Sequence, residues 1–258
     1  MPTAPTAHAH RYDDLFYRYQ REGAARSASQ VLPRVLRHLD VRSVLDVGCG
    51  AGAWVKAYED LGVPTCVGID GDYVDRSVLL MKPENFQPLD IARPFDLGRQ
   101  FDLVQCLEVA EHVPSHAGDV LIDNLARHGR MVLFSAAPPG QGGEDHINER
   151  PYGYWRDAFA RHGFQLYDFV RPEMRDDPLI EPWYRFNVLF FAHCSIVASL
   201  PAAVTRFAVP DNGVIPDVSP WAYQARKLLL RCLSPRLVSR MAVWKHRRIV
   251  DTMAKGSP

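Results

Sequence analysis

The sequence has little that would tie it to a membrane, an oxidising compartment or a zinc site. None of its 258 residues belongs to a run of the roughly 18 consecutive apolar residues that a transmembrane helix requires. The first residues, MPTAPTAHAHRYDD, lack the apolar stretch of a signal peptide. The five cysteines are scattered without C-x-x-C spacing, which favours reduced thiols over disulfides or bound zinc. We therefore expect a cytoplasmic protein.

The chain also lacks a net charge, but its charges are unevenly distributed. It contains 30 basic and 30 acidic residues, and the segment 219–258 holds nine basic residues and one acidic residue. We expect a main domain over 1–200, a linker rich in proline over 201–218 and a basic helical C-terminal extension over 219–258. The extension could pack on the domain, form a homodimer or make a peripheral contact with an anionic membrane. Nucleic acid is a poor candidate, because no RNA-binding module that combines aromatic and basic residues is visible.

Short apolar runs alternate with helical patterns along the first 195 residues. This alternation predicts an α/β fold with a doubly wound, mostly parallel sheet. The expected strands are 43–47, 65–69, 85–90, 101–107, 130–136, 164–170 and 186–192. The expected helices are 24–39, 52–61, a stretch after Glu108, 118–127, 151–162, 220–233 and 235–254. Prolines between the last two strands disfavour a crossover helix, so we expect that pair to be antiparallel.

A glycine-rich turn follows the first expected strand in the stretch VLDVGCGAGAW. Gly48, Gly50 and Gly52 would bring backbone N–H groups and a helix N-terminus close to a ligand. Their spacing loosely fits the fingerprint for a nicotinamide or flavin dinucleotide. However, Asp46 stands two residues before the first glycine, where its carboxylate would repel a pyrophosphate. That charge favours a cationic ligand.

Four stretches together carry a more specific signal than the glycines alone. They are VLDVGCGAG, VGID, PLD and FDLVQCLEVAEHV, within roughly residues 40–195. In these stretches the chain resembles the class I S-adenosylmethionine-dependent methyltransferases of the small-molecule or sugar-tailoring type. The resemblance implies a seven-stranded Rossmann-like methyltransferase fold, S-adenosyl-L-methionine as cofactor and methyl transfer to an acceptor.

The resemblance also implies which residues bind each part of the cofactor. Asp70 would accept hydrogen bonds from both ribose hydroxyls, because a carboxylate offers two acceptor atoms. Asp90 would accept a bond from the adenine amine, although an Asp in this position could instead form an Asx turn. The other implied cofactor residues are Asp46, Gly48, Gly50 and Gly52 at the methionine part, Ile91 on the adenine ring, and Leu107 and Glu108 on the methionine or acceptor side.

The acceptor should bind beyond the carboxyl ends of the strands, in the loops after the fourth and fifth. Glu111 and His112 follow the fourth strand, where we expect them early in a helix, either as catalytic groups or as capping residues. The loop PPGQGGEDHINERPYGYW follows the fifth strand, and His146 is its candidate general base. The alternative for His146 is a bond to nearby backbone. The expected acceptor-binding residues are Asn148 for a hydroxyl, and Tyr154 and Trp155 for stacking.

The nature of the acceptor rests on the same loop. The phrases FSAAPPGQGG and DHINERPYGYW resemble bacterial enzymes of glycan or natural-product tailoring, which implies O-methylation of a small-molecule hydroxyl. N-methylation of a small-molecule amine, or methylation of RNA or protein, are the alternatives. A divalent ion held by Asp145, His146 and Glu149 could assist the reaction. Hard cations prefer several oxygen ligands, however, so we expect no metal.

Overall fold

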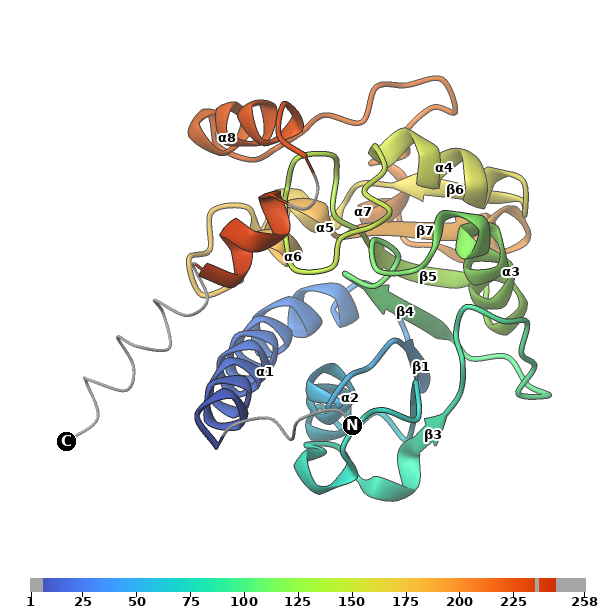
Figure 1. Cartoon of the computed structure of the whole chain (residues 1–258). Coiled ribbons are helices and arrows are strands. Elements are labelled where there is room, and N and C mark those ends of the chain that lie inside the picture. Colours follow the sequence, from blue (N-terminus) through green and yellow to red (C-terminus); the bar gives the residue numbers. More distant parts are fainter. Residues whose placement is uncertain (1–6, 235–236, 245–258) are drawn as a thin grey trace.

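The computed structural model describes the backbone of residues 7–234 and 237–244, and the side chains of these ranges from residue 21 onward. A seven-stranded sheet crosses the molecule in the order β3-β2-β1-β4-β5-β7-β6 (Figure 1). The first five strands pair in parallel, and β7 runs antiparallel to both β5 and β6. The strands are β1 (Ser43–Val47), β2 (Thr65–Asp70), β3 (Phe86–Pro88), β4 (Leu103–Leu107), β5 (Met131–Ser135), β6 (Phe164–Tyr167) and β7 (Leu189–His193).

Helices cover both faces of the sheet, so its central strands are buried on both sides. Val44 of β1 packs into a core with α1 and α2, whereas its neighbour Leu45 packs into the core under α3 and α4. Successive side chains of a strand point to opposite faces, so a strand between two helical layers must be apolar throughout. The helices are α1 (Ala7–Leu36), α2 (Ala53–Asp60), α3 (Gly118–His128), α4 (Tyr152–Ala160), α5 (Val170–Met174), α6 (Pro182–Asn187), α7 (Ala202–Thr205) and α8 (Trp221–Arg231).

The strand order reverses between β1 and β4. β1 pairs with β2 on one side and with β4 on the other. In an open parallel sheet such a reversal leaves a crevice outside the carboxyl ends of the strands, because the connections depart to opposite faces. The glycine turn after β1, Asp70 at the end of β2 and Glu108 just after β4 therefore share one edge of the sheet.

The doubly wound sheet and its antiparallel pair are confirmed, and two of the expected helices differ most from the structure. The first helix begins at Ala7, well before the expected residue 24. The helix expected after Glu108 is absent: residues 110–112 form a turn, followed by a 3₁₀ turn at Ser115–Ala117. The carbonyl of Glu111 accepts hydrogen bonds from the N–H groups of Ile147 and Asn148, so this backbone bonds to another loop instead of to a helix.

The segment 201–218, expected as a linker, contacts the domain along its first half. Val204 of α7 is fully buried, and the N–H of Val209 donates to the carbonyl of Leu166 in β6. α8 then lies over the loop that follows β5 (Figure 1). The second expected tail helix, 235–254, lies largely outside the described residues. The part of it that the structure describes, 237–244, is helical.

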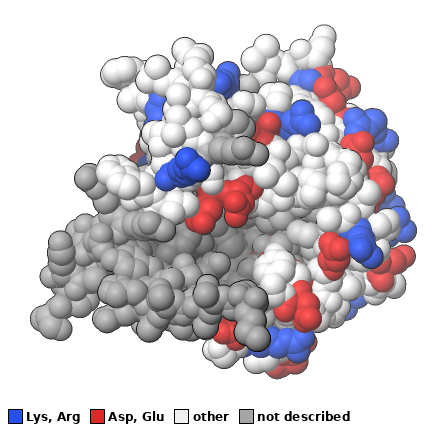
Figure 2. All heavy atoms as spheres, viewed as in Figure 1, with Lys and Arg blue, Asp and Glu red and all other residues white. Residues whose placement is uncertain are grey.

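The surface charges and the helix lengths bear on possible contacts with a membrane. On the face shown in Figure 2, acidic and basic side chains are interspersed among uncharged ones. Within the part of the chain that the structure describes, every helix is too short or too polar to cross a bilayer.

Candidate active site

The glycine turn joins β1 to α2 through three residues in the left-handed region. Gly48, Gly50 and Gly52 have φ values of 80°, 53° and 78°. A Cβ at Gly48 would lie 2.5 Å from the Val109 side chain, whereas a Cβ at Gly50 would meet nothing within 4 Å. The turn is therefore packed against the protein at Gly48 and faces open space at Gly50, where a ligand can approach the backbone.

Asp46 lies beneath this turn as a buried carboxylate. It is 3% exposed, and its Oδ1 accepts a hydrogen bond of 3.1 Å from Gln105 of β4. Its Oδ2 is buried without a hydrogen-bond partner among the described residues. Burial, reinforced by the nearby charge of Asp70 and opposed by Gln105, raises the pKa of Asp46 to about 7. A cationic group bound nearby would satisfy this carboxylate.

Asp70, at the carboxyl end of β2, binds the backbone of the loops on either side of it. Its Oδ2 accepts a 2.7 Å bond from Gly50 N–H, and its Oδ1 accepts a 2.7 Å bond from Gly71 N–H and a bond from the Tyr73 hydroxyl. The carboxylate thus holds the glycine turn in place. The ribose-binding role expected for Asp70 would share these oxygens with the turn.

Asp90 and Ile91 lie beside Asp70, because Leu89 N–H donates to the Asp70 carbonyl at 2.8 Å. Asp90 is exposed, and its Oδ1 accepts from Ala92 N–H in the Asx turn that was the alternative for this residue. Its Oδ2 also lies 3.1 Å from Arg93 Nε. Ile91 is half-buried. The structure thus gives Asp90 a local structural role and leaves its adenine-binding role as a prediction.

Glu108 stands at the end of β4, next to the buried Leu107, with a φ of 55°. Its carboxylate accepts a 2.8 Å hydrogen bond from Gln141 and a 3.2 Å bond from Asn187, and Asn187 also donates to Gln141. Burial raises the pKa of Glu108, although these bonds oppose the shift. Gln141 and Asn187 were missed in the sequence, because no local pattern pairs a loop glutamine with an asparagine at the end of α6.

Glu111, His112 and His146 form one cluster in the structure. Their potential metal-binding atoms all lie within 4.8 Å of one another, and the two imidazole rings meet edge to face at 4.9 Å. Glu111 is fully buried, and neither of its carboxylate oxygens has a hydrogen-bond partner among the described residues. Burial and the neighbouring Glu108 raise the pKa of Glu111, although the backbone N–H groups of Glu111 and Ala137 oppose the shift. His112 keeps an exposed surface, and the partial desolvation of its ring and the nearby His146 lower its pKa.

Both histidine rings are held through Nδ1. His146 Nδ1 lies 3.0 Å from Glu149 Oε1, and His112 Nδ1 lies 3.3 Å from the carbonyl oxygen of Asp145. Glu149 also accepts from the N–H groups of Gly140 and Gly142. Although burial opposes ionisation, the bonds from His146 and these two N–H groups lower the pKa of Glu149. The structure therefore differs from the alternative in which His146 bonds to nearby backbone, because its partner is the Glu149 carboxylate.

Of the three residues expected to bind the acceptor, Trp155 lies in the core, and the acceptor-binding roles of Asn148 and Tyr154 stay predictions. Trp155 is 1% exposed and packs against Phe134 in the core, so the stacking role expected for it is wrong. The buried Asn148 donates to the Ala110 carbonyl at 3.1 Å and accepts from Arg150. Tyr154 is half-buried, with Arg150 over its ring. Helical spacing alone did not show which face of α4 is turned toward the sheet.

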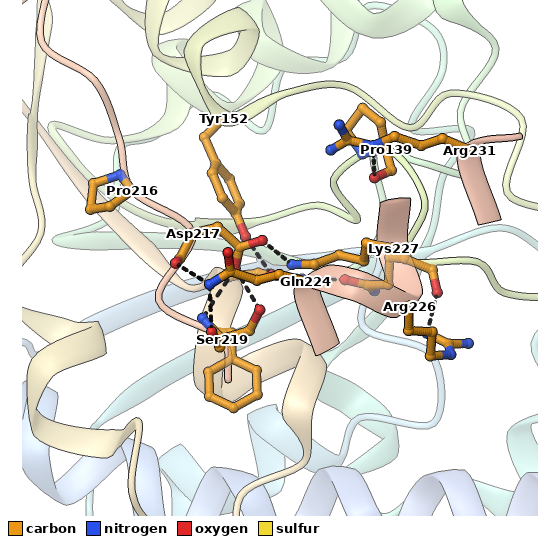
Figure 3. A network of polar contacts seen from close by, with 12 residues as sticks. Pro139, Tyr152, Pro216, Asp217, Ser219, Gln224, Arg226, Lys227 and Arg231 are labelled. Atoms are coloured by element: carbon orange, nitrogen blue, oxygen red, sulfur yellow. Dashed lines mark hydrogen bonds and ion pairs between the residues drawn. The ribbon is translucent and has the colours of Figure 1, made fainter. Parts of the chain in front are cut away.

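Polar contacts tie α8 to the loop that follows β5, and Figure 3 shows Arg231 of the helix beside Pro139 of the loop. Arg226 donates to the carbonyl of Gln141 at 3.0 Å, and Arg231 donates to that of Pro139 at 2.8 Å. The buried Lys227 forms an ion pair with Asp217. A cavity of about 1000 Å³ remains between this loop, α6 and the C-terminal segment. Its lining includes Gln141, Trp183, Phe186, Asn187, Tyr223 and Leu230.

Replacing Asp46 with asparagine should stabilise the unliganded protein at alkaline pH. The pKa of Asp46 is about 7 in the fold, against an ordinary value of 3.8, so the folded protein retains a proton that the unfolded chain releases. Stability from this group is therefore greatest below about pH 4, falls as the pH rises toward 7 and is constant above it. Asp46→Asn should raise the melting temperature at pH 8 and leave it nearly unchanged at pH 4. A lower melting temperature at pH 8 would contradict this expectation.

Replacing Gly140 with alanine should release α8 from the loop. Gly140 has a φ of 84°, and a Cβ there would lie 2.2 Å from the carbonyl oxygen of Lys227. Gly62 is the matched control, because it has a φ of 80° and nothing within 4 Å of its Cβ position. In both variants the free energy of unfolding should fall by about 1 kcal/mol, because alanine is strained in the left-handed region. Only Gly140→Ala should speed amide hydrogen exchange in α8; equal exchange in both variants would argue against the close contact.

Comparison with known proteins gives one family and several similar folds. A family model described as a methyltransferase domain matches residues 17–172, more than half of the chain. The structure is similar to the sugar N-methyltransferase KedS8 from Streptoalloteichus sp ATCC 53650, with 18% identity, a TM-score of 0.54, and coverage of 75% of this chain and 95% of that one. It is also similar to SAM-bound CalS10 from Micromonospora echinaspora, an amino pentose methyltransferase involved in calicheamicin biosynthesis, with 15% identity, a TM-score of 0.50, and coverage of 75% and 99%.

No functionally curated protein matches the sequence. The two structural similarities lie at identities that show the fold alone, whereas the family match spans the glycine turn, Asp70, Glu108 and the cluster around His146. The cofactor of this family also fits the site, because Asp46 offers an unpartnered carboxylate oxygen and Gly50 offers open space beside the turn. The chain therefore belongs to the class I S-adenosylmethionine-dependent methyltransferases, with S-adenosyl-L-methionine as its cofactor.

Proposed function

We propose that this enzyme methylates a hydroxyl group of a small molecule, a sugar, glycan or natural product, with His146 as general base. The observation that carries the proposal is the ring of His146, fixed through Nδ1 by the carboxylate of Glu149 in the loop after β5. A carboxylate that binds one nitrogen of an imidazole orients the ring and stabilises its protonated form. Nε2 is then the nitrogen that can accept a proton.

The residues of this chain would divide the work of methyl transfer between positioning and proton removal. S-adenosylmethionine, when bound, supplies an activated methyl group on a sulfonium. Gly48, Gly50 and Gly52 would let the backbone approach the methionine part, and Asp46 would offer a carboxylate to its positive charge. Because the methyl donor is already activated, correct placement of the acceptor accounts for most of the rate. A base is needed because a hydroxyl is poorly ionised at neutral pH, and His146 Nε2 would take that proton.

The cavity beside α8 supports an acceptor with an apolar or aromatic body. Gln141 and Asn187 line it, and both bind the Glu108 carboxylate at the end of β4. Aromatic side chains at Trp183, Phe186 and Tyr223 offer ring faces to a sugar or to a planar natural product.

The five cysteines are free thiols in the structure, which supports a reducing cytoplasm as the setting.

Methylation of a small-molecule amine is the second candidate. Two proteins of similar fold are a sugar N-methyltransferase and an amino pentose methyltransferase. The acidic side chains Glu108 and Glu111 would attract an ammonium ion. Incubating the enzyme with a hydroxy sugar and its amino counterpart, and identifying the products by mass spectrometry, separates the two. Methylation of the amino sugar alone would replace O-methylation by N-methylation in the proposal.

Replacing His146 with alanine should lower kcat by about 10²–10⁴, the usual contribution of a general base. Affinity for S-adenosylhomocysteine should be unchanged, because His146 lies on the acceptor side. His116→Ala is the control, since His116 is exposed in the 3₁₀ turn before α3 and lies outside the cluster. A His146→Ala enzyme with unchanged kcat would remove the base from the proposal.

The exposed face of α8 bears on partners. Trp221, Leu228 and Leu229 are 82%, 64% and 70% exposed on a helix whose charged residues are all basic. Such a face is typical of contact with an anionic membrane or with a second copy of the chain. The double replacement of Leu228 and Leu229 by serine should abolish sedimentation with anionic liposomes if the membrane is the partner. It should instead convert a dimer to a monomer in analytical ultracentrifugation if the partner is a second copy, and no change in either measurement would exclude both.

A further inference from the structure

The cluster of Glu111, His112 and His146 has the composition of a metal site. Glu111 and His112 come from the turn after β4, and His146 comes from the loop after β5. These two loops lie together because the carbonyl of Glu111 accepts hydrogen bonds from the N–H groups of Ile147 and Asn148, each at 2.9 Å. One ligand atom from each of the three side chains lies within 4.8 Å of the others. A single ion could therefore contact all three after small side-chain movements.

The carboxylate of Glu111 is an independent indication of a ligand. It is fully buried, and neither oxygen has a hydrogen-bond partner among the described residues. Burying an unpaired carboxylate is costly, and buried charges in proteins are as a rule paired or bound to a metal. Besides the backbone N–H groups of Glu111 and Ala137, which favour its ionised form, the side chains that face it are Glu108, also acidic, and the two histidines. The described chain therefore supplies no Lys or Arg partner at this point.

The two histidines are oriented as metal ligands usually are. His146 bonds through Nδ1 to the carboxylate of Glu149, and His112 bonds through Nδ1 to the carbonyl of Asp145. Metal-binding imidazoles almost always bind a carboxylate or a carbonyl through the nitrogen that does not contact the metal, which fixes the ring and its tautomer. In both residues this leaves Nε2 as the ligand atom.

We infer that Glu111, His112 and His146 bind one divalent transition-metal ion. Two imidazoles and one carboxylate suit ions from Mn²⁺ to Zn²⁺, whereas Mg²⁺ and Ca²⁺ prefer oxygen ligands throughout. The set differs from Asp145, His146 and Glu149, the combination weighed from the sequence. Glu149 is already bound by two backbone N–H groups and serves to hold His146, and Asp145 offers its backbone carbonyl to His112.

Three protein ligands leave positions open on such an ion. An acceptor oxygen bound there would lie close to Glu108 and would become more acidic, since a bound cation lowers the pKa of a coordinated hydroxyl. The released proton would pass to solvent, and His146 would act as a ligand in place of a base. This role rests on the proposed function, whereas the binding of the ion does not.

Zinc binding by the full-length, EDTA-treated protein tests the inference directly. Equilibrium dialysis against Zn²⁺ with elemental analysis should show one bound ion per chain in the parent protein. Glu111→Gln and His112→Gln should each lower the affinity for Zn²⁺ by more than about tenfold. His116→Gln is the control and should bind as the parent does. Zinc bound equally by the parent and by both site variants would overturn the inference.

Thermal denaturation guards against variants that simply fail to fold. Glu111→Gln removes the unpaired buried charge, so without metal it should melt at or above the temperature of the parent protein. Zn²⁺ should raise the melting temperature of the parent and His116→Gln only, because an ion that binds the native state stabilises it. A Glu111→Gln protein that is folded and still stabilised by Zn²⁺ to the same extent as the parent would contradict the site.

The outcomes separate this inference from the proposed function. If the ion binds as described and hydroxy sugars remain unmethylated while amino sugars react, the metal site stands and O-methylation fails. If hydroxyl methylation proceeds at an undiminished rate in EDTA-treated protein that binds no zinc, the metal site fails and His146 stands as the base.

Discussion

The bond between the Gly50 N–H and the Asp70 carboxylate holds the cofactor half of the site together. It ties the turn after β1 to the end of β2, and the N–H groups of Gly48 and Cys49 reinforce it by donating to the Ile69 carbonyl. Three left-handed glycines have no intrinsic preference for this path, so the neighbouring strand must define it. Val109 packs against Gly48 and places the loop after β4 over the same turn. The turn after β1 is thus held by Asp70 at the end of β2 and packed on its other side by Val109 from the loop after β4.

The sheet could be predicted from the sequence because each central strand is buried on both faces and appears as a continuous apolar run. Asp46 could be recognised for the opposite reason, as a charge in such a run beside a glycine turn. The stretch after Glu108 could not, because its backbone bonds to Ile147 and Asn148, more than thirty residues further along the chain. Trp155 was misjudged because the buried face of α4 is decided by contacts with Phe134 in the sheet, which helical spacing does not reveal.

The acceptor side was only partly predictable for a related reason. Glu111, His112 and His146 were each identifiable as reactive residues, but their convergence depends on two loops whose contact has no signature in either segment. Gln141 and Asn187 carry no signal at all, since each becomes significant only through its bond to Glu108. α8 was expected as a helix, and its place over the loop follows from Arg226 and Arg231 binding carbonyls that any sequence would offer.

Three carboxylates in this site, those of Asp46, Glu108 and Glu111, have their pKa raised by burial. Each is therefore a cost to the unliganded fold, and Glu108 alone of the three has hydrogen bonds to both oxygens. Cationic ligands offset such a cost: a methionine ammonium or sulfonium at Asp46, and a divalent ion at Glu111. A cationic ligand gains affinity in such a site because it pairs a buried carboxylate. The unliganded protein is less stable for the same reason, and the site selects positive ligands. The same burial explains why a phosphate-bearing dinucleotide is a poor occupant, since it would add negative charge where the fold already holds an excess.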